Sequence, residues 1–314
     1  SINFLANHSP VQAPDSDIAR YSAMYQDGWT KLREARAKRA AALGIIPANA
    51  PMVTMATTPD WAKLDAEERA AAVRVMQAYG GMATAMDREV GRLVAHLKAT
   101  GQYENTIFVF LSDNGAEPTN PFSIARNRLF LNMQYDTSTA NIGRRGSFSA
   151  IGPGWASAAA SPLSGYKFSA TEGGLRVPLI VTWPGNPKVR AGAVNGGLAH
   201  VTDILPTLAE LAGVADHGGT WKGKAVEPVT GRSLVPMLGG APGSVHGDEP
   251  LGYELSGNSA LFRGDYKLVR NLPPTGDGRW RLFDLKNDPG ETKDLSSAMP
   301  DRFAAMMADY RTYA

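Results

Sequence analysis

Asp113 and Asn114 are the residues whose types and position best suit chemistry in this sequence. They follow an apolar run, residues 107–111, and precede Gly115. A carboxylate oxygen beside an amide oxygen suits a hard cation, either Ca²⁺ or the less favoured Mg²⁺. The alternative is a simple turn, because Asp, Asn and Gly are the residues that turns prefer. The two residue types alone leave both interpretations open.

His8 and Lys167 are candidates for contact with an anionic ligand. His8 lies between a short strand-like segment and Pro10, where its ring nitrogens can face a ligand. Lys167 offers a point cation. The alternatives are an exposed loop histidine and a surface lysine whose stem packs along apolar groups. Asp203 precedes an apolar helical pattern, and we interpret it as a helix cap.

The composition excludes several classes of function. The 314 residues are 43% hydrophobic, carry a net charge of +2 and contain no cysteine. Disulfides, thiolate metal sites and a cysteine nucleophile are therefore excluded. A balanced charge without a basic block gives no reason to expect a nucleic-acid or anionic-membrane partner. No apolar run reaches membrane-spanning length.

The apolar patterns predict a layered α/β domain. The uninterrupted run ending at Leu111 is typical of a strand that is buried on both faces in a parallel sheet, and residues 175–184 give a second such strand. Residues 16–43 indicate a helical region that ends at Gly44. Asp65 and Glu68 have capping-box spacing, and the helix they begin carries an apolar stripe over residues 86–97 that we expect in the core. Residues 203–213 predict a short helix.

Two further regions are set apart by their patterns. Residues 114–167 are rich in Ser, Gly and Asn, and we expect an irregular loop that forms a wall of the substrate pocket. Residues 218–224 read Gly-x-x-x-x-Gly-Lys, but Ala225 follows and no strand precedes them, so we reject a phosphate-binding loop. After residue 240 the pattern changes to short strands at 251–255, 259–263, 266–270 and 280–285, followed by a helix at 301–313. We therefore expect domains at 1–240 and 241–314, the second a small α+β unit with an antiparallel sheet.

Several motifs, in their order along the chain, resemble the type I sulfatases of the alkaline-phosphatase superfamily. The closest resemblance is to bacterial arylsulfatases and alkylsulfatases of the Pseudomonas type. The resemblance implies a bacterial sulfuric ester hydrolase with an alkaline-phosphatase-like α/β fold. The motifs are His8 to Pro14, Phe110 to Glu117, Tyr166-Lys167, Gly173 to Pro178, Asp203 to Gly213, Leu282 to Leu285 and Asp288 to Glu291.

The resemblance also implies roles for single residues. Asp113 and Asn114 match two ligands of the family's active-site Ca²⁺, while His8 and Lys167 match the residues that contact the sulfate ester. The family's nucleophile is a formylglycine made from a Cys or Ser within a Cys/Ser-x-Pro/Ala-x-Arg motif, and this sequence contains neither form. The chain therefore resembles the part of a sulfatase that follows the nucleophile region. With two ligands for a cation that takes about six to eight oxygens, we expect weak Ca²⁺ binding by this chain alone.

Two classes of function follow from these observations. In the first, the chain is part of a sulfatase acting on a small-molecule sulfate ester, with formylglycine supplied by a complementary N-terminal half. In the second, it is a truncated, non-catalytic relative. A phosphomonoester or phosphonate hydrolase of the same superfamily is a further alternative. The isolated chain is expected to be inactive. We expect a soluble protein of the bacterial cytoplasm or periplasm, and the sequence does not decide between these compartments.

Overall fold

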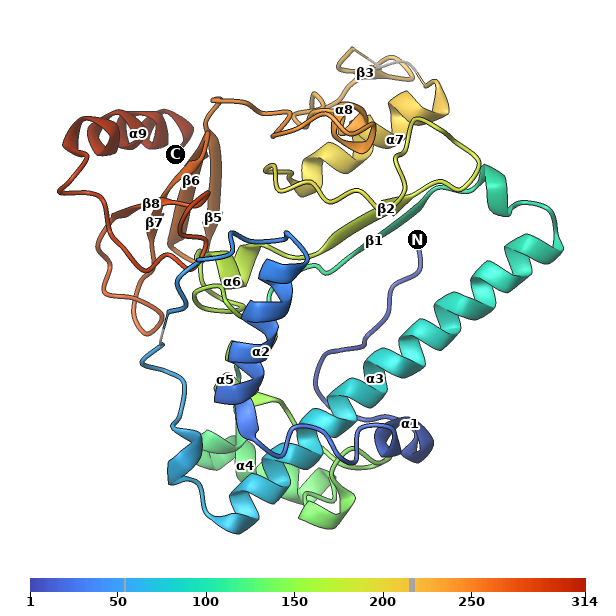
Figure 1. The fold of residues 1–314 in the computed structure, drawn as a ribbon, viewed down its shortest axis with the longest axis vertical. Coiled ribbons are helices and arrows are strands. Elements are labelled where there is room, and N and C mark those ends of the chain that lie inside the picture. Colours follow the sequence, from blue (N-terminus) through green and yellow to red (C-terminus); the bar gives the residue numbers. More distant parts are fainter. Residues whose placement is uncertain (54, 215–217) are drawn as a thin grey trace.

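A cluster of large aromatic side chains forms the core of the N-terminal part of the molecule. The computed structural model describes residues 1–53, 55–214 and 218–314 (Figure 1). Trp29, Trp61 and Trp155 pack edge to face, with ring centroids 4.7 to 5.8 Å apart. The helices α1 (Asp15–Ala19), α2 (Gly28–Ala42), α3 (Ala66–Ala99) and α5 (Gly152–Ala159) supply most of this core.

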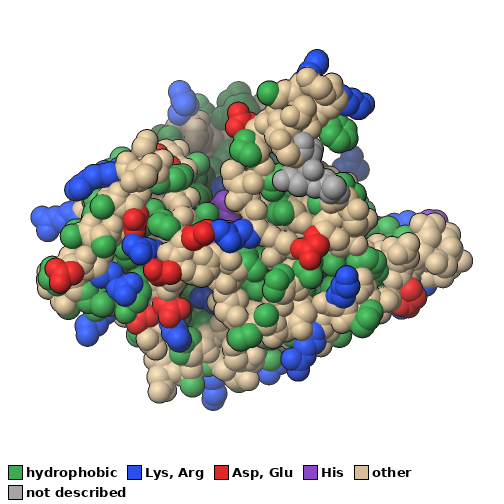
Figure 2. Space-filling view, turned by 90° about the horizontal axis from the view of Figure 1, so that it is seen from above, with side chains coloured by type: hydrophobic (Ala, Val, Ile, Leu, Met, Phe, Trp, Pro, Cys, Tyr) green, Lys and Arg blue, Asp and Glu red, His purple; other side chains and the backbone are tan. Residues whose placement is uncertain are grey.

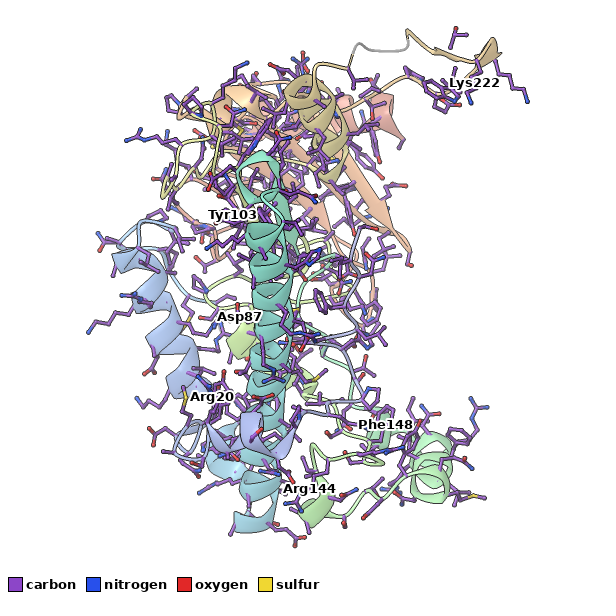
Figure 3. The ribbon with its side chains drawn as sticks, turned by 90° about the vertical axis from the view of Figure 1, so that its right-hand side faces the viewer. Arg20, Asp87, Tyr103, Arg144, Phe148 and Lys222 are labelled. Atoms are coloured by element: carbon purple, nitrogen blue, oxygen red, sulfur yellow. The ribbon has the colours of Figure 1, made fainter. Side chains whose placement is uncertain are left out.

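The long helix α3 begins at the predicted capping box. The Asp65 carboxylate accepts a hydrogen bond from the Glu68 N–H at 2.8 Å, and the Glu68 carboxylate accepts one from the Asp65 N–H at 3.0 Å. The core prediction for the stripe at residues 86–97 is wrong, because its apolar side chains are only half-buried. The fully buried positions of α3 lie earlier, between Val73 and Met82. Figure 3 shows α3 upright, with the helix continuing past Asp87 toward Tyr103.

The predicted helical region at 16–43 is divided into α1 and α2. Turns occupy most of residues 20–27, and α2 begins at Gly28, whose φ of +78° is in the left-handed region. A side chain at this position would also clash with the Trp61 ring, because an added Cβ lies 2.2 Å from it. Only glycine satisfies both conditions without strain.

The strands β1 (Phe108–Leu111) and β2 (Leu179–Thr182) lie side by side and are antiparallel. The parallel, doubly covered arrangement predicted for these runs is therefore wrong. The helix α7 (Ile204–Ala212) packs on one face, where Val109 and Val181 lie. On the other face Phe110 is 42% and Ile180 57% exposed. An apolar run does not show whether a strand is parallel or antiparallel to its neighbour, because that depends on the path of the 67 residues between the two strands, 112–178.

We expect the 314-residue chain to self-associate through the open face of β1 and β2. In the part of the chain that the structure describes, β1 and β2 form a sheet of two strands. Exposed apolar side chains beside unpaired strand edges favour association. Ile180→Ser should reduce the association, whereas Leu129→Ser, at a position on α4 (Ala125–Gln134) that is somewhat more exposed, should not. Light scattering across a concentration series measures both. A concentration-independent monomer for the parent chain would contradict the prediction.

The tract at 114–167 is more regular than predicted. It contains α4 and α5 together with the short helices η3 (Pro121–Ser123) and η4 (Thr139–Asn141). Figure 3 shows α4 projecting from the body near Phe148. The helix α5 is buried and packs on α2, because its small residues allow close approach to Trp29. The predicted irregular loop is therefore wrong for these helices.

The C-terminal antiparallel sheet is confirmed. The strands are β5 (Leu251–Leu255), β6 (Asn258–Arg263), β7 (Tyr266–Arg270) and β8 (Arg281–Asp284), in that spatial order. The helix α9 (Pro300–Tyr313) covers one face, with Met306 and Tyr310 buried against the sheet. The other face contacts the segment around Ala170. The division of the chain at residue 240 stays a prediction.

Short elements complete the described chain. They are η1 (Trp61–Lys63), η2 (Tyr103–Asn105), η5 (Val201–Asp203), α6 (Glu172–Leu175), β3 (Thr220–Trp221), β4 (Lys224–Ala225) and α8 (Val235–Leu238). The predicted helix at 203–213 is confirmed as α7, which ends at Gly213 with a φ of +68°. Lys222 lies at the tip of the β3–β4 hairpin, away from the body (Figure 3).

The surface agrees with the balanced charge of the sequence. Figure 2 shows acidic and basic side chains interspersed among apolar ones on the face seen from above. Among the described residues, none of the helices combines the length and the apolar character needed to cross a membrane.

Candidate active site

His8, Glu117 and Lys167 converge from three distant parts of the chain. The Lys167 ammonium lies 2.9 Å from a Glu117 carboxylate oxygen and 3.2 Å from His8 Nε2. The same Glu117 oxygen lies 3.6 Å from His8 Nε2. The His8 side chain is 53% exposed, whereas those of Lys167 and Glu117 are 19% and 12% exposed. The cluster is therefore open to solvent at His8 and enclosed at the other two residues.

Backbone contacts bring the segment after β1 against the segment that carries Lys167. The Lys167 N–H donates to the Ala116 carbonyl, and the Gly115 N–H donates to the Gly174 carbonyl, both at 3.0 Å. Gly115 is required at this crossing, because a Cβ there would lie 2.0 Å from the Gly173 carbonyl oxygen. A turn was one of the two interpretations left open for this segment, and the structure adds a steric reason for the glycine.

The hydrogen bonds define the tautomer of His8. Its Nδ1 lies 2.9 Å from the Ser9 carbonyl oxygen, which can only accept, so Nδ1 carries the proton. Nε2 then accepts from the Lys167 ammonium. A ligand that takes over the ammonium would release Nε2 for a new partner.

Glu117 is the member of the cluster to which sequence reasoning assigned no role. Burial alone would raise the pKa of its carboxyl group, but hydrogen bonds from Thr119 and Lys167 outweigh burial and lower that pKa. The Thr119 N–H donates at 2.9 Å, and the Thr119 hydroxyl donates to the same oxygen. Glu117 is thus kept ionised beside Lys167. Its place at the end of the motif Phe110 to Glu117 was the signal that could have identified it.

Asp113 and Asn114 follow β1 and come three and two residues before Ala116, whose carbonyl accepts a hydrogen bond from the Lys167 N–H. Asp113 is exposed and Asn114 is half-buried. Within residues 1–53, 55–214 and 218–314, no three His, Cys, Asp or Glu side chains group as a metal site. The two residues do fit a hard cation as part of a larger ligand set, since both side chains offer oxygen donors and Asp113 is accessible. They supply fewer ligands than Ca²⁺ takes.

Asp203 serves a structural role. Its carboxylate is fully buried, accepts hydrogen bonds from the His200 and Arg232 N–H groups at 2.7 and 2.8 Å, and lies 2.8 Å from His246 Nε2. The contact with His200 completes a capping box at η5 and leaves α7 without a side-chain cap. Asp203 occupies the N-cap position of α7, but its side chain caps no N–H of that helix, so the interpretation of Asp203 as a side-chain cap of the apolar helix is wrong.

A second charged cluster, Glu172, Lys267 and Glu291, lies buried beside the Lys167 segment. Lys267 is fully buried, and its Nζ lies 2.9 Å from a Glu172 oxygen and 3.0 Å from Glu291 Oε1. The contact with Glu291 Oε1 is an ion pair whose geometry does not form a hydrogen bond. The Glu172 N–H donates to the other Glu291 oxygen at 2.8 Å. Burial opposes the charge of Lys267, but the two carboxylates outweigh it and raise its pKa. Burial, assisted by the Glu172 charge and opposed by Lys267, raises the pKa of Glu291 to about 7.

The structure thus brings a histidine, a lysine and a glutamate together at the segment that follows β1, on a chain with both helices and sheets. Residues 1–214 match the sequence profile of the sulfatase family. The chain belongs to the sulfatase family of the alkaline-phosphatase superfamily.

Two relatives illustrate the sequence similarity. An uncharacterized sulfatase of Schizosaccharomyces pombe is 36% identical over 305 residues, which cover 95% of this chain and 54% of that protein. An arylsulfatase of Klebsiella aerogenes is 37% identical over 232 residues, covering 74% of this chain and 49% of the relative. The chain thus spans about half the length of these relatives.

Solved structures show the same fold. Ps i-CgsB superposes with a TM-score of 0.59 at 24% identity, over 99% of this chain and 48% of that one. A phosphonate monoester hydrolase from Silicibacter pomeroyi gives a TM-score of 0.54 at 19% identity, over 98% and 54% of the two chains. These similarities confirm the alkaline-phosphatase-like α/β fold that the motifs implied.

Proposed function

We propose that the protein containing this chain hydrolyses sulfate monoesters, of the arylsulfatase type, at the site formed by His8, Glu117 and Lys167. The observation that carries the proposal is the convergence of these three residues at the segment that follows β1, which also contains Asp113 and Asn114. A sulfate ester is an anion whose leaving oxygen gains charge as the bond to sulfur breaks. The site therefore needs a cation for the sulfuryl oxygens and a proton donor for the leaving oxygen.

The residues of this chain meet these needs in distinct ways. Lys167 binds a sulfuryl oxygen through its ammonium, and Glu117 holds that ammonium in place at 2.9 Å. His8 is the exposed member of the cluster and contacts the ester from the solvent side. Once the sulfate engages Lys167, Nε2 of His8 is free to hold a proton for the leaving oxygen.

Asp113 and Asn114 would hold Ca²⁺ together with ligands from outside this chain. When bound, Ca²⁺ neutralises charge on the sulfuryl oxygens, and formylglycine supplies the nucleophile. We propose that both the nucleophile and the remaining ligands come from a complementary N-terminal half. In this proposal residues 1–240 complete the catalytic domain, and residues 241–314 form the small C-terminal subdomain.

An assay with matched substrates tests the proposed function. The protein purified from its own source, together with any segment that accompanies residues 1–314, is expected to release sulfate from 4-nitrophenyl sulfate. It should act more slowly on 4-nitrophenyl phosphate and on a phenyl phosphonate monoester. Intact mass identifies a companion polypeptide. A preference for the phosphonate would favour the alternative hydrolase, while no turnover of any ester would favour a non-catalytic relative.

We expect Asp113→Ala to reduce Ca²⁺ retention by the complete protein more than Asn114→Ala does. A carboxylate offsets the charge of the ion, whereas an amide contributes only a dipole. Metal analysis after dialysis gives the occupancy of each variant. Asp87→Ala, at an exposed position on α3, is the control and should keep full occupancy. Full occupancy in Asp113→Ala would remove Asp113 from the metal site.

A further inference from the structure

We propose that Asn258 and Asn271, buried at one end of the C-terminal sheet, are positioning residues for Lys167. The proposal rests on the assignment of Lys167 to the sulfate-binding site. Both asparagines are 8% exposed, and their side-chain hydrogen bonds reach the backbone of residues 168 and 170. They therefore act on the segment that presents the lysine. We call the pair the asparagine clamp.

The conformation of Phe168 shows why the segment needs external support. Its φ of +73° is in the left-handed region, which bulky side chains rarely adopt. Phe168 is 49% exposed, so burial does not hold this conformation in place. A residue held in a sparsely populated region persists when its surroundings fix it, and such residues gather at functional sites. Phe168 directly follows Lys167, whose ammonium lies 5.3 Å from the centre of the Phe168 ring.

Asn258 contacts the strained residue directly. Its side-chain amide donates a 2.7 Å hydrogen bond to the Phe168 carbonyl, while its oxygen accepts the Leu272 N–H at 2.8 Å. The second contact fixes which end of the amide faces Phe168, because an oxygen that accepts from Leu272 leaves the nitrogen to donate. The conformation of Phe168 is therefore coupled to β6, which contains Asn258.

Asn271 holds the backbone two residues further along. Its side-chain oxygen accepts the Ala170 N–H at 2.6 Å. The following turn is fixed in the same way, because the Glu172 N–H donates to the buried Glu291 carboxylate. On the other side, the Lys167 N–H donates to Ala116. The segment of Lys167 is thus held by one hydrogen bond to the residues that follow β1 and by three hydrogen bonds to the C-terminal part of the chain. A small shift of the C-terminal sheet would therefore displace the Lys167 ammonium.

Asn258→Ala tests the clamp against a matched variant, Tyr310→Phe. The Tyr310 hydroxyl donates to Glu254 and contacts Ser259 on the side of the same sheet that faces α9, so its loss disturbs the sheet without touching residues 164–174. The first readout is the acylation rate of Lys167 by an N-hydroxysuccinimide ester, followed by peptide mass spectrometry. The second is kcat on 4-nitrophenyl sulfate.

Asn258→Ala is expected to increase Lys167 acylation and to lower kcat by roughly 10- to 100-fold, since misplacement by about 1 Å costs on the order of 10²-fold. Tyr310→Phe should leave both unchanged. At position 271, Asn271→Asp keeps an acceptor for the Ala170 N–H and should retain more activity than Asn271→Ala. This comparison of the two variants is the second test if Asn258→Ala does not fold.

Two results would overturn the proposal. One is an Asn258→Ala variant that matches Tyr310→Phe in both Lys167 acylation and kcat. The other is an Asn271→Asp variant that is as impaired as Asn271→Ala at equal melting temperature. The acylation readout does not depend on turnover. If Asn258→Ala increases Lys167 acylation but the parent protein hydrolyses no sulfate ester, the asparagine clamp is supported and the proposed function is rejected.

Discussion

Lys167→Ala is expected to lower the turnover of an aryl sulfate by about 10²-fold or more, by analogy with the loss of one oxyanion-stabilising donor. Lys167 is the cation of the cluster, 2.9 Å from Glu117 and 3.2 Å from His8. Its removal leaves the sulfuryl oxygens without that charge as the leaving oxygen departs. Steady-state kinetics on 4-nitrophenyl sulfate with the complete protein measures the effect.

The control for this prediction is Lys31→Ala. Lys31 pairs with Glu34 on the surface of α2, where its side chain is 68% exposed. Exposed ion pairs contribute little to stability, so this variant should match the parent in both rate and melting temperature. Lys167→Ala should keep its Ca²⁺ content, because an ammonium binds no cation. Parental kcat and KM in Lys167→Ala would place Lys167 outside the active site.

Lys267→Met is expected to lower the free energy of unfolding at pH 7.5 by about 3–5 kcal/mol, the range for breaking a buried ion pair by removing one partner. The substitution leaves Glu172 and Glu291 buried together without a cation. Methionine has a similar length, so the loss of charge dominates over a change in volume. Urea unfolding of the 314-residue chain measures the difference, and Lys286→Met, at an exposed pair with Asp265, is the control.

The pH dependence of the free energy of unfolding tests whether the loss of the Lys267 charge causes the destabilisation. A carboxyl group whose pKa is raised on folding keeps its proton in the native state after the unfolded chain has lost it. The contribution of Glu291 to stability therefore falls as pH rises from about 4.5 to about 7, and is constant above that range. Lys267 opposes the rise in the pKa of Glu291, so that pKa rises further without Lys267 and acidification should restore part of the lost stability. A Lys267→Met variant that shows the same deficit at pH 5 and pH 7.5 would rule out this electrostatic explanation.

Local features of the fold were predictable from the sequence because their causes are local. The capping box of Asp65 and Glu68 is defined by spacing, and the end of α7 at Gly213 by the tolerance of glycine for positive φ. The strands β5 to β8 follow from short apolar runs separated by turn residues. The antiparallel pairing of β1 with β2 was not predictable, since it depends on the path of the chain between the two strands.

The candidate site was predictable only through its motifs. His8 and Lys167 are 159 positions apart, and no local pattern indicates that their side chains meet. Glu117 was missed because one glutamate in a loop has no periodicity, and its function depends on two partners distant in sequence. The asparagine clamp was missed for the same reason, since Asn258 and Asn271 are ordinary strand-end residues until the structure places them beside Phe168 and Ala170.

The glycine crossing at Gly115 determines how the site responds to thermal motion. Gly115 and Gly174 are joined through their main chains, and the Gly173 carbonyl leaves no space for a Cβ at position 115. The main-chain positions of Gly115 and Gly174 are therefore fixed relative to each other by peptide geometry, and rotation of side chains cannot change them. The backbone segments that carry the oxygen donors and the lysine should consequently move together, so that motion of the surrounding loops changes access to the site more than it changes the spacing of these two segments.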